Sequence, residues 1–553
     1  MPDHVADPAA ATRAPRLAAQ VLDELLERHP VWATGLGDHR GDDRLDDLGE
    51  PALDELARWA SARLRELREV APGTPEPADR VDLEILTNAL ELRVFEIEQL
   101  REHTWDPLVA NPGNGIYTLL ARDFAPLGDR LRAIAGRLRA VPEALAVARG
   151  QLRDMPAVHV ETAIVQFTGT KTLIAAELGA ALAQEPALRA EVEPVRDAAA
   201  EALDEHVAWL RSQLEHSTRD PRLGAELYAR KLALTLDTDL GPADLLARAE
   251  AELERISAQI AETAGRLDGA GRGPERVRGV LDRLASDGHV DNDTIVGLCE
   301  QALADTAAFV REHDLVTVHD DPVKIVVMPE IHRGVAVAYC DPPGPLEREP
   351  LPTYFAISPT PEDWSEDRVR SFFREYNAHM LHNLTVHEAM PGHVLQLAHN
   401  NRFRSQVPVR AALWSGSFVE GWAVYAEEVM AGAGYRGAAN AALRMQQLKM
   451  QLRMTINAIL DVRVHTGELT ESEAMALMQR RGFQEEGEAA GKWRRALLTS
   501  AQLSTYFVGY LEVSALAGDL ARTYPSLSVR HRHDELLGHG SPAPRHLRVL
   551  LGL

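Results

Sequence analysis

The sequence lacks the features of several large protein classes. It has only two cysteines, Cys299 and Cys340, among 553 residues, which excludes a disulfide framework and a cysteine-rich zinc site. It has no apolar run near the ~20 residues that span a bilayer. Its first residues lack the basic segment and apolar core of a secretory signal. We therefore expect a cytoplasmic protein.

Positive charge is also scarce, since the formal net charge is −24. A chain this acidic repels phosphate backbones and anionic lipid headgroups, so neither nucleic acid nor a membrane is an expected partner. Hydrophobic residues make up 45% and charged residues 26% of the chain. These shares are typical of a globular protein.

Helical periodicity dominates the chain and predicts a predominantly α fold. Over Pro242–Leu267, apolar residues repeat at spacings of three and four, after a proline where a first helical turn tolerates one. We expect residues 1–15 to form a loose tail and residues 16–553 to form one helical domain. The loop DGAGRGP, residues 268–274, could divide that domain into two lobes, residues 16–267 and 275–553.

One region departs from this pattern. Three short runs are rich in β-branched and aromatic residues and are bounded by proline and glycine, namely Lys324–Met328, Val335–Tyr339 and Thr353–Ile357. They predict a small β-sheet close to the candidate active site. Such a sheet could present an edge to an extended peptide, or it could be a structural hairpin with no substrate role. Ser365 then predicts the N-cap of a helix that continues to Pro391.

The motif HEAMPGH, residues 387–393, is the strongest chemical signal in the sequence. In HExxH, two histidines at i and i+4 share one helix face and bind zinc. Here His387 and His393 are six residues apart, which leaves them ~120° apart on a regular helix. Pro391 cannot continue the helix, and Gly392 can take backbone angles closed to other residues. We therefore interpret the motif as HExxH with two inserted residues that rotate His393 back toward His387.

A third ligand is expected on another helix. Glu420 lies in FVEGWAVYAEEVM, where Phe418 and Trp422 flank it. A carboxylate among apolar side chains is costly unless it is paired or bound to a metal. Glu427, two turns further on, could hold a ligand histidine in place.

These motifs resemble the domain of unknown function 885 (DUF 885) family. HEAMPGHVLQ followed by FVEGWAVYAEE is similar to the pattern of that family, HEAxPGHxxQ and then EGWAxYxE. PVWATGLGDHRGDDRLDD, VETAIVQFTG and AQLSTYFVGYLEV are similar to its other conserved segments, so the resemblance extends over almost the whole chain. Members of the family resemble zinc carboxypeptidases of the carboxypeptidase Taq group, which are large multi-helix metallopeptidases.

The resemblance implies a role for each matching residue. His387, His393 and Glu420 would bind one zinc ion, and Glu388 would be the general base. Tyr506, whose place in the sequence matches that role, would stabilise the tetrahedral intermediate. His465 is a second candidate for that role, although HTGELT departs here from the pattern of the family by lacking a tryptophan.

Other candidates are weaker. His379 and Asn383 share a helix face with His387 and could line a cleft above the metal, or could be ordinary surface residues. Arg463 and Arg494, with Arg495, could bind a substrate carboxylate or form surface salt bridges. The acidic run at 485–488 is interpreted as a solvated helix face. A di-iron site needs Glu-x-x-His pairs, which the sequence does not contain.

The predicted function is hydrolysis of short peptides or acylated amino acids by a zinc-dependent peptidase, either carboxypeptidase-like or oligopeptidase-like. Two alternatives stay open. One is a metal-dependent amide hydrolase that acts on a non-peptide metabolite. The other is a non-catalytic helical binding protein with a relic site.

Overall fold

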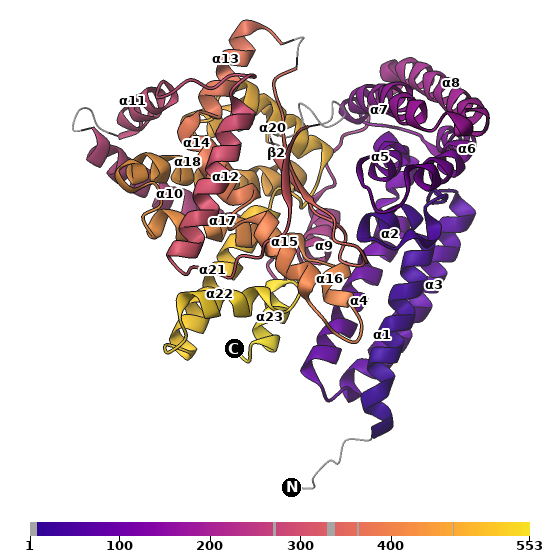
Figure 1. Cartoon of the computed structure of the whole chain (residues 1–553), viewed down its shortest axis with the longest axis horizontal. Helices are drawn as coiled ribbons and strands as arrows, with labels where there is room; N and C mark the ends of the chain where they lie inside the picture. Colours follow the sequence, from indigo (N-terminus) through magenta and orange to yellow (C-terminus); the bar gives the residue numbers. More distant parts are fainter. Residues whose placement is uncertain (1–7, 269–272, 329–337, 362–363, 468) are drawn as a thin grey trace. The chain divides into compact units, whose positions relative to one another are not determined.

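The fold is predominantly helical, as predicted. The computed structural model describes residues 8–268, 273–328, 338–361, 364–467 and 469–553. Helices contain 73% of the residues and strands contain 3% (Figure 1). Residues 1–7 of the predicted tail lie outside the described residues, and the chain is helical from Pro8. Within the described ranges, no helix is long and apolar enough to cross a membrane.

The chain forms two compact units. Unit 1 consists of residues 1–221, 343–351 and 404–413, and unit 2 consists of residues 222–342, 352–403 and 414–553. The boundary therefore precedes the predicted loop at 268–274, of which residues 269–272 lie outside the described residues. The reason is packing. The apolar faces of α9 (Ala225–Leu236) and α10 (Pro242–Leu267) share one core with α18 (Asn440–Thr466), so both helices belong to unit 2.

Unit 1 is an assembly of helices from the N-terminal part of the chain. It also includes two segments from later in the sequence, residues 343–351 and 404–413. Its helices are α1 (Pro8–Arg28), α2 (Pro30–Leu36), α3 (Glu50–Val70), α4 (Pro77–Phe95), α5 (Gly113–Ala121), α6 (Leu127–Gln151), α7 (Ala157–Gln184), α8 (Arg189–Gln213) and α16 (Val409–Ala412). The buried ion pair between Arg410 Nε and Asp82 Oδ1, at 2.8 Å, joins α16 to α4.

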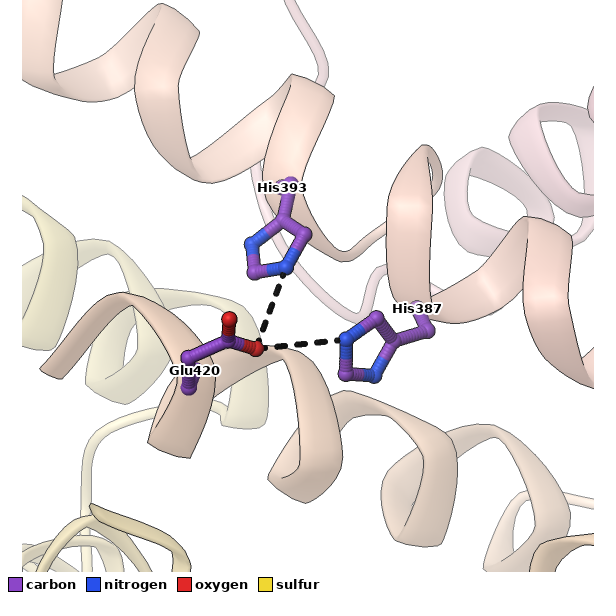
Figure 2. Close-up of side chains that lie close together, drawn as sticks. All are labelled: His387, His393 and Glu420. Atoms are coloured by element: carbon purple, nitrogen blue, oxygen red, sulfur yellow. Dashed lines mark ion pairs between the residues drawn. The ribbon is translucent and has the colours of Figure 1, made fainter. Parts of the chain in front are cut away.

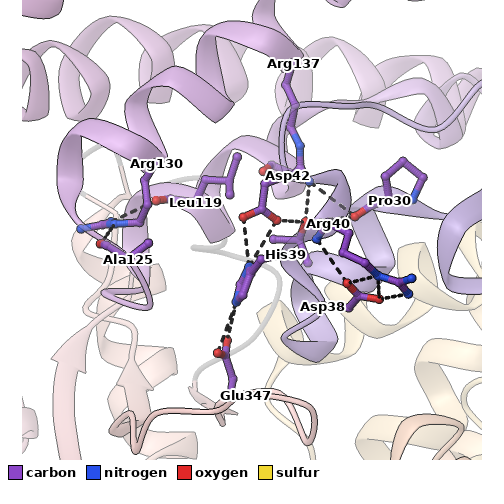
Figure 3. A network of polar contacts seen from close by, with 12 residues as sticks. Pro30, Asp38, His39, Arg40, Asp42, Leu119, Ala125, Arg130, Arg137 and Glu347 are labelled. Atoms are coloured by element: carbon purple, nitrogen blue, oxygen red, sulfur yellow. Dashed lines mark hydrogen bonds and ion pairs between the residues drawn. The ribbon is translucent and has the colours of Figure 1, made fainter. Parts of the chain in front are cut away.

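The segment 343–351 is joined to unit 1 through His39 (Figure 3). His39 Nδ1 lies 3.0 Å from Asp42 Oδ2, and its Nε2 lies 3.2 Å from Glu347 Oε2. The imidazole ring stacks on Phe124 with 3.7 Å between the centroids. Burial by itself lowers the pKa of His39, but the hydrogen bonds to Asp42 and Glu347 raise it to about 9. The ring is therefore a cation held between two carboxylates at neutral pH.

Unit 2 contains the remaining helices and the sheet. Its other helices are α11 (Gly273–Ala285), α12 (Ile295–Glu312), α13 (Glu366–Glu375), α14 (Ala378–Glu388), α15 (His393–Arg402), α17 (Gly416–Gly432), α19 (Glu471–Arg481), α20 (Glu486–Leu498), α21 (Thr505–Thr523), α22 (Val529–Leu537) and α23 (Pro544–Leu550).

Helices α17 and α21 approach each other closely through glycine. A Cβ atom added to Gly421 would lie 2.4 Å from the carbonyl carbon of Gly509, and one added to Gly509 would lie 2.0 Å from the carbonyl oxygen of Ser417. No side chain fits at either position without moving a helix. This contact fixes the position of Glu420 on α17 relative to Tyr506 on α21.

The predicted sheet is present, with three described strands in the order β1-β3-β2. Strand β1 (Val323–Val327) pairs in parallel with β3 (Thr353–Ile357), and β2 (Ala338–Asp341) pairs antiparallel with β3. Part of the predicted middle run, residues 335–337, lies outside the described residues. Strand β2 contacts α14, which places the sheet beside the helix that contains His387.

The helix expected from Ser365 to Pro391 is two helices. Ser365 is the predicted N-cap and accepts a hydrogen bond from the Arg368 N–H, but α13 ends at Glu375. Asn377 then caps α14, because its side-chain oxygen accepts from the N–H groups of His379 and Met380. An asparagine inside a helical pattern can cap a new helix, and here it does.

Candidate metal centre

The turn between α14 and α15 has the disruption that the histidine spacing predicts. Helix α14 ends at Glu388 and α15 begins at His393, with a cis peptide bond between Met390 and Pro391. The Gly392 N–H donates to Val386 O at 2.9 Å. A Cβ atom on Gly392 would lie 1.8 Å from the carbonyl oxygen of His387, so only glycine fits this turn.

Helix α17 holds this turn in place. The indole N–H of Trp422 donates to the carbonyl oxygen of Pro391 at 2.8 Å, and the indole is fully buried. Trp422 follows Glu420 by two residues, so a single turn of α17 provides both the third candidate ligand and the anchor for the turn before His393. From the sequence, Trp422 is recognisable only as an apolar neighbour of Glu420.

His387, His393 and Glu420 converge from three helices on one point (Figure 2). The Nε2 atoms of both histidines lie 3.4 Å from Glu420 Oε2. The two imidazole rings are almost perpendicular, at 86°, with 4.8 Å between their centroids. The histidine side chains are 10% exposed and the Glu420 side chain is 21% exposed, so the cluster keeps access to solvent.

The donor set fits a zinc ion. Around a tetrahedral zinc with bonds of ~2.0–2.1 Å, ligand atoms are separated by roughly 3.3–3.4 Å. Both Nε2-to-Oε2 separations match this spacing, and all three candidate ligand atoms lie within 4.8 Å of one another. Glu420 Oε2 is also buried without a hydrogen-bond partner among the described residues, which is costly for a carboxylate oxygen that no cation contacts. His387, His393 and Glu420 could therefore hold one zinc ion.

Glu427 fixes the orientation of His387, as its spacing from Glu420 suggested. The Nδ1 atom of His387 lies 2.7 Å from Glu427 Oε1, and the Asn383 side-chain amide donates to Glu427 Oε2 at 2.7 Å. A proton on Nδ1 leaves the Nε2 lone pair directed at the cluster. Burial by itself lowers the pKa of His387, but the nearby carboxylates of Glu420 and Glu427 raise it well above its usual value. The carboxylates thus favour positive charge at this point.

Glu388 is placed next to the cluster, where a general base is needed. Its carboxylate accepts a hydrogen bond from the backbone N–H of Cys340 in β2. Burial raises its pKa above the usual range, although His387 and His393 oppose the shift. The sheet thus contributes a donor to the candidate base, a contact that the sequence did not predict.

Tyr506 lies on α21 near the same cluster. Its hydroxyl is 3.4 Å from Arg495 Nη2, and Arg495 also donates to Gln502 Oε1 at 2.8 Å. Burial raises the pKa of Tyr506, and the negative charge of Glu420 adds to the shift. The phenol therefore stays protonated and can donate a hydrogen bond.

The structure does not bring His465 to this cluster. Its Nδ1 accepts from the Leu223 N–H at 3.3 Å, and its Nε2 lies 2.9 Å from the carbonyl oxygen of Thr499. The ring also stacks on Tyr228. Both nitrogens are thus engaged with backbone groups, so His465 is not available to stabilise a reaction intermediate at the cluster.

Three other candidates also lie in different surroundings. His379 Nε2 is 3.5 Å from Asp287 Oδ2, so it contacts a surface carboxylate rather than the cluster. Arg463 forms an exposed ion pair with Glu250. Arg494 is exposed on α20, whereas its neighbour Arg495 contacts Tyr506.

Comparisons with known proteins identify relatives but no activity. The family described as "Bacterial protein of unknown function (DUF885)" matches residues 30–551. None of the curated proteins matches the chain. The resemblance to the carboxypeptidase Taq group stays a prediction.

Two solved structures share the fold. A "putative lipoprotein of unknown function" from Shewanella oneidensis is 28% identical, with a TM-score of 0.82 over 98% of this chain and 100% of that one. A "putative lipoprotein" from Colwellia psychrerythraea is 16% identical, with a TM-score of 0.77 over 98% and 99% of the two chains. The prediction of a cytoplasmic protein is wrong by this comparison, because lipoproteins are anchored to a membrane.

Proposed function

We propose that this chain, which belongs to the DUF885 family, is a zinc-dependent peptidase that hydrolyses short peptides or acylated amino acids. The observation that carries the proposal is the convergence of His387, His393 and Glu420, whose candidate ligand atoms lie within 4.8 Å of one another. Two histidines and one carboxylate form the ligand set of many hydrolytic zinc sites, which leave a fourth position open.

The mechanism follows from the side chains around the cluster. A zinc ion held there would act as a Lewis acid on the scissile carbonyl and would acidify water. Glu388 takes a proton from the attacking water and returns it to the leaving amine, for which its raised pKa is suited. The Tyr506 hydroxyl donates to the oxyanion as it forms. Glu427 keeps the His387 ring in the orientation in which it would hold the metal.

The first test separates metal binding from catalysis. Glu388→Gln keeps the size of the side chain but cannot accept a proton, so we expect full zinc content and a loss of at least ~10²–10⁴-fold in peptide hydrolysis. Glu420→Gln removes a charged ligand, so we expect weaker zinc retention as well as lost activity. Zinc content by elemental analysis and hydrolysis of a short-peptide library are measured on each purified variant.

Each outcome has a clear meaning. Full activity in Glu388→Gln would refute the role of Glu388, and full zinc retention in Glu420→Gln would refute the ligand set. A parent protein that binds zinc but cleaves no peptide in a broad panel would exclude the peptidase. A panel of non-peptide amides would then test for an amide hydrolase.

A further inference from the structure

Lys492 is a buried lysine whose amine forms no ion pair within the described residues. Its side chain is on α20 and only 6% of it is exposed. No hydrogen bond or ion pair joins its amine to any of the residues that the structure describes. Burial of an ammonium group is costly without a partner, and lysine is almost never fully buried unless it is paired.

The carboxylate nearest in sequence is already engaged. Glu488 precedes Lys492 by one helical turn, but it forms an ion pair with Arg453 and accepts a hydrogen bond from the Tyr376 hydroxyl at 3.2 Å. Its side chain is 20% exposed, so this part of the acidic run is not the solvated face that the sequence suggested. Burial, together with the nearby Arg453 guanidinium, lowers the pKa of Lys492 well below its usual value.

Arg495 is a second cation without a carboxylate. It follows Lys492 by three residues, so both side chains lie on one face of α20. Its described partners are the neutral groups Gln502 Oε1 and the Tyr506 hydroxyl. No ion pair to Arg495 occurs within the described residues. One face of this helix therefore presents two basic side chains that form no ion pair among the described residues.

These two basic side chains lie beside the candidate metal centre. Arg495 contacts Tyr506 directly, and the charge of Glu420 acts on both Lys492 and Tyr506. An anion bound between Lys492 and Arg495 would therefore lie next to the proposed oxyanion donor. A carboxylate fits this pair, because it can accept two parallel hydrogen bonds from a guanidinium and a third from an ammonium group.

We propose that Lys492 and Arg495 form a subsite for a substrate carboxylate. This inference rests on the proposed function and specifies its substrate class, namely peptides or acylated amino acids with a free carboxylate close to the scissile amide. The carboxylate could be the C-terminus, which would make the enzyme an exopeptidase, or an acidic side chain. Lys492 and Arg495 are thereby specificity residues and take no part in proton transfer.

The experiment compares three matched substrates with the zinc-loaded full-length protein. These are a short peptide with a free C-terminus, the same peptide as its C-terminal amide, and that amide with glutamate as the last residue. We expect the amide to lower kcat/KM by about 10–100-fold relative to the free acid, as expected for the loss of a hydrogen bond between charged groups. Recovery with the glutamate peptide amide would identify a side-chain carboxylate as the source.

Lys492→Met tests the residue itself. We expect it to lower kcat/KM for the free acid by about 10–100-fold and to change kcat/KM for the amide by no more than about threefold. The preference for the free acid over the amide should therefore disappear. Lys492→Arg should keep most of the preference. The midpoint of thermal unfolding should not fall in Lys492→Met, because no buried partner is left unpaired. The exposed Arg480 of α19 provides the charge-matched control, since Arg480→Gln should leave kcat/KM unchanged for both the free acid and the amide.

Several results would overturn the inference. Equal cleavage of all three peptides by the parent protein would refute it while leaving the peptidase in place, as would an unchanged preference in Lys492→Met. If Lys492→Met does not fold, Arg495→Gln answers the same question. If the parent cleaves no peptide, the peptidase proposal fails, and calorimetry with an N-acetyl amino acid and its amide still tests the subsite. Equal binding of those two ligands would then refute it.

Discussion

Replacing Gly509 by alanine should disturb the metal centre from a distance. The new Cβ atom would lie 2.0 Å from the carbonyl oxygen of Ser417, and real Cβ atoms essentially never come within 3.0 Å of another heavy atom. The obstacle is helix backbone, which cannot rotate away as a side chain can. Helices α17 and α21 must therefore separate by about 1 Å or distort by a similar amount.

The expected cost can be stated for both stability and function. Overpacking a tight contact costs ~1–3 kcal/mol, and the higher helix propensity of alanine offsets at most ~1 kcal/mol of that. Since the obstacle is backbone, we expect the upper part of this range. Glu420 precedes the contacting Gly421 by one residue, and a displacement of ~1 Å at a catalytic site can cost ~10²-fold in rate. Zinc should also be held more weakly.

The assay uses a matched control on the same helix. A Cβ atom on Gly518 would meet only the end of the Arg522 side chain, at 3.5 Å, so Gly518→Ala should be neutral or stabilising by up to ~1 kcal/mol. Thermal unfolding and zinc competition with a chelator are measured for both variants. If Gly509→Ala matched Gly518→Ala in unfolding temperature and zinc affinity, the close approach of α17 and α21 would not position Glu420 as we have argued.

Two further predictions concern Glu427 and His39. In Glu427→Gln only one acceptor oxygen remains for His387 and Asn383, so zinc affinity should fall by ~10–100-fold; unchanged affinity in chelator competition would contradict this role. The pKa of His39 is raised to about 9, so its stabilising contribution is complete below pH 6.5 and is lost as the pH rises to about 9. We expect the free energy of unfolding to fall by about 1–3 kcal/mol over that window, after allowance for the partial exposure of the ring. Denaturant titrations should show no such fall in His39→Gln, and an equal fall in both proteins would refute the assignment.

Local patterns in the sequence predicted local structure well. Periodicity and a leading proline defined α10 over the same residues that the structure shows, Pro242–Leu267. The conflict between histidine spacing and helix geometry predicted the break before His393. The apolar neighbours of Glu420 marked it as a carboxylate that would need a partner. Each of these predictions depends on residues within about two helical turns of one another.

Features that depend on distant residues were not predictable. The boundary between the units depends on the packing of α10 on α18, about 200 residues later, which no local pattern near residue 221 shows. The glycine contact between α17 and α21 needs both helices in place. Lys492 is a lysine among charged residues, and such a residue is normally exposed, so only its burial reveals a site.

The division of unit 1 among three stretches of sequence has a consequence for synthesis. Arg410 follows its buried partner Asp82 by 328 positions, so the pair can form only after the whole stretch between them has been translated. At ~5–20 residues per second, the interval between residues 221 and 413 takes about 10–40 s on the ribosome. Until residue 413 has been made, helices α1 to α8 lack at least one of the two later segments. The N-terminal unit of this protein is therefore completed late, after the HEAMPGH motif has been made.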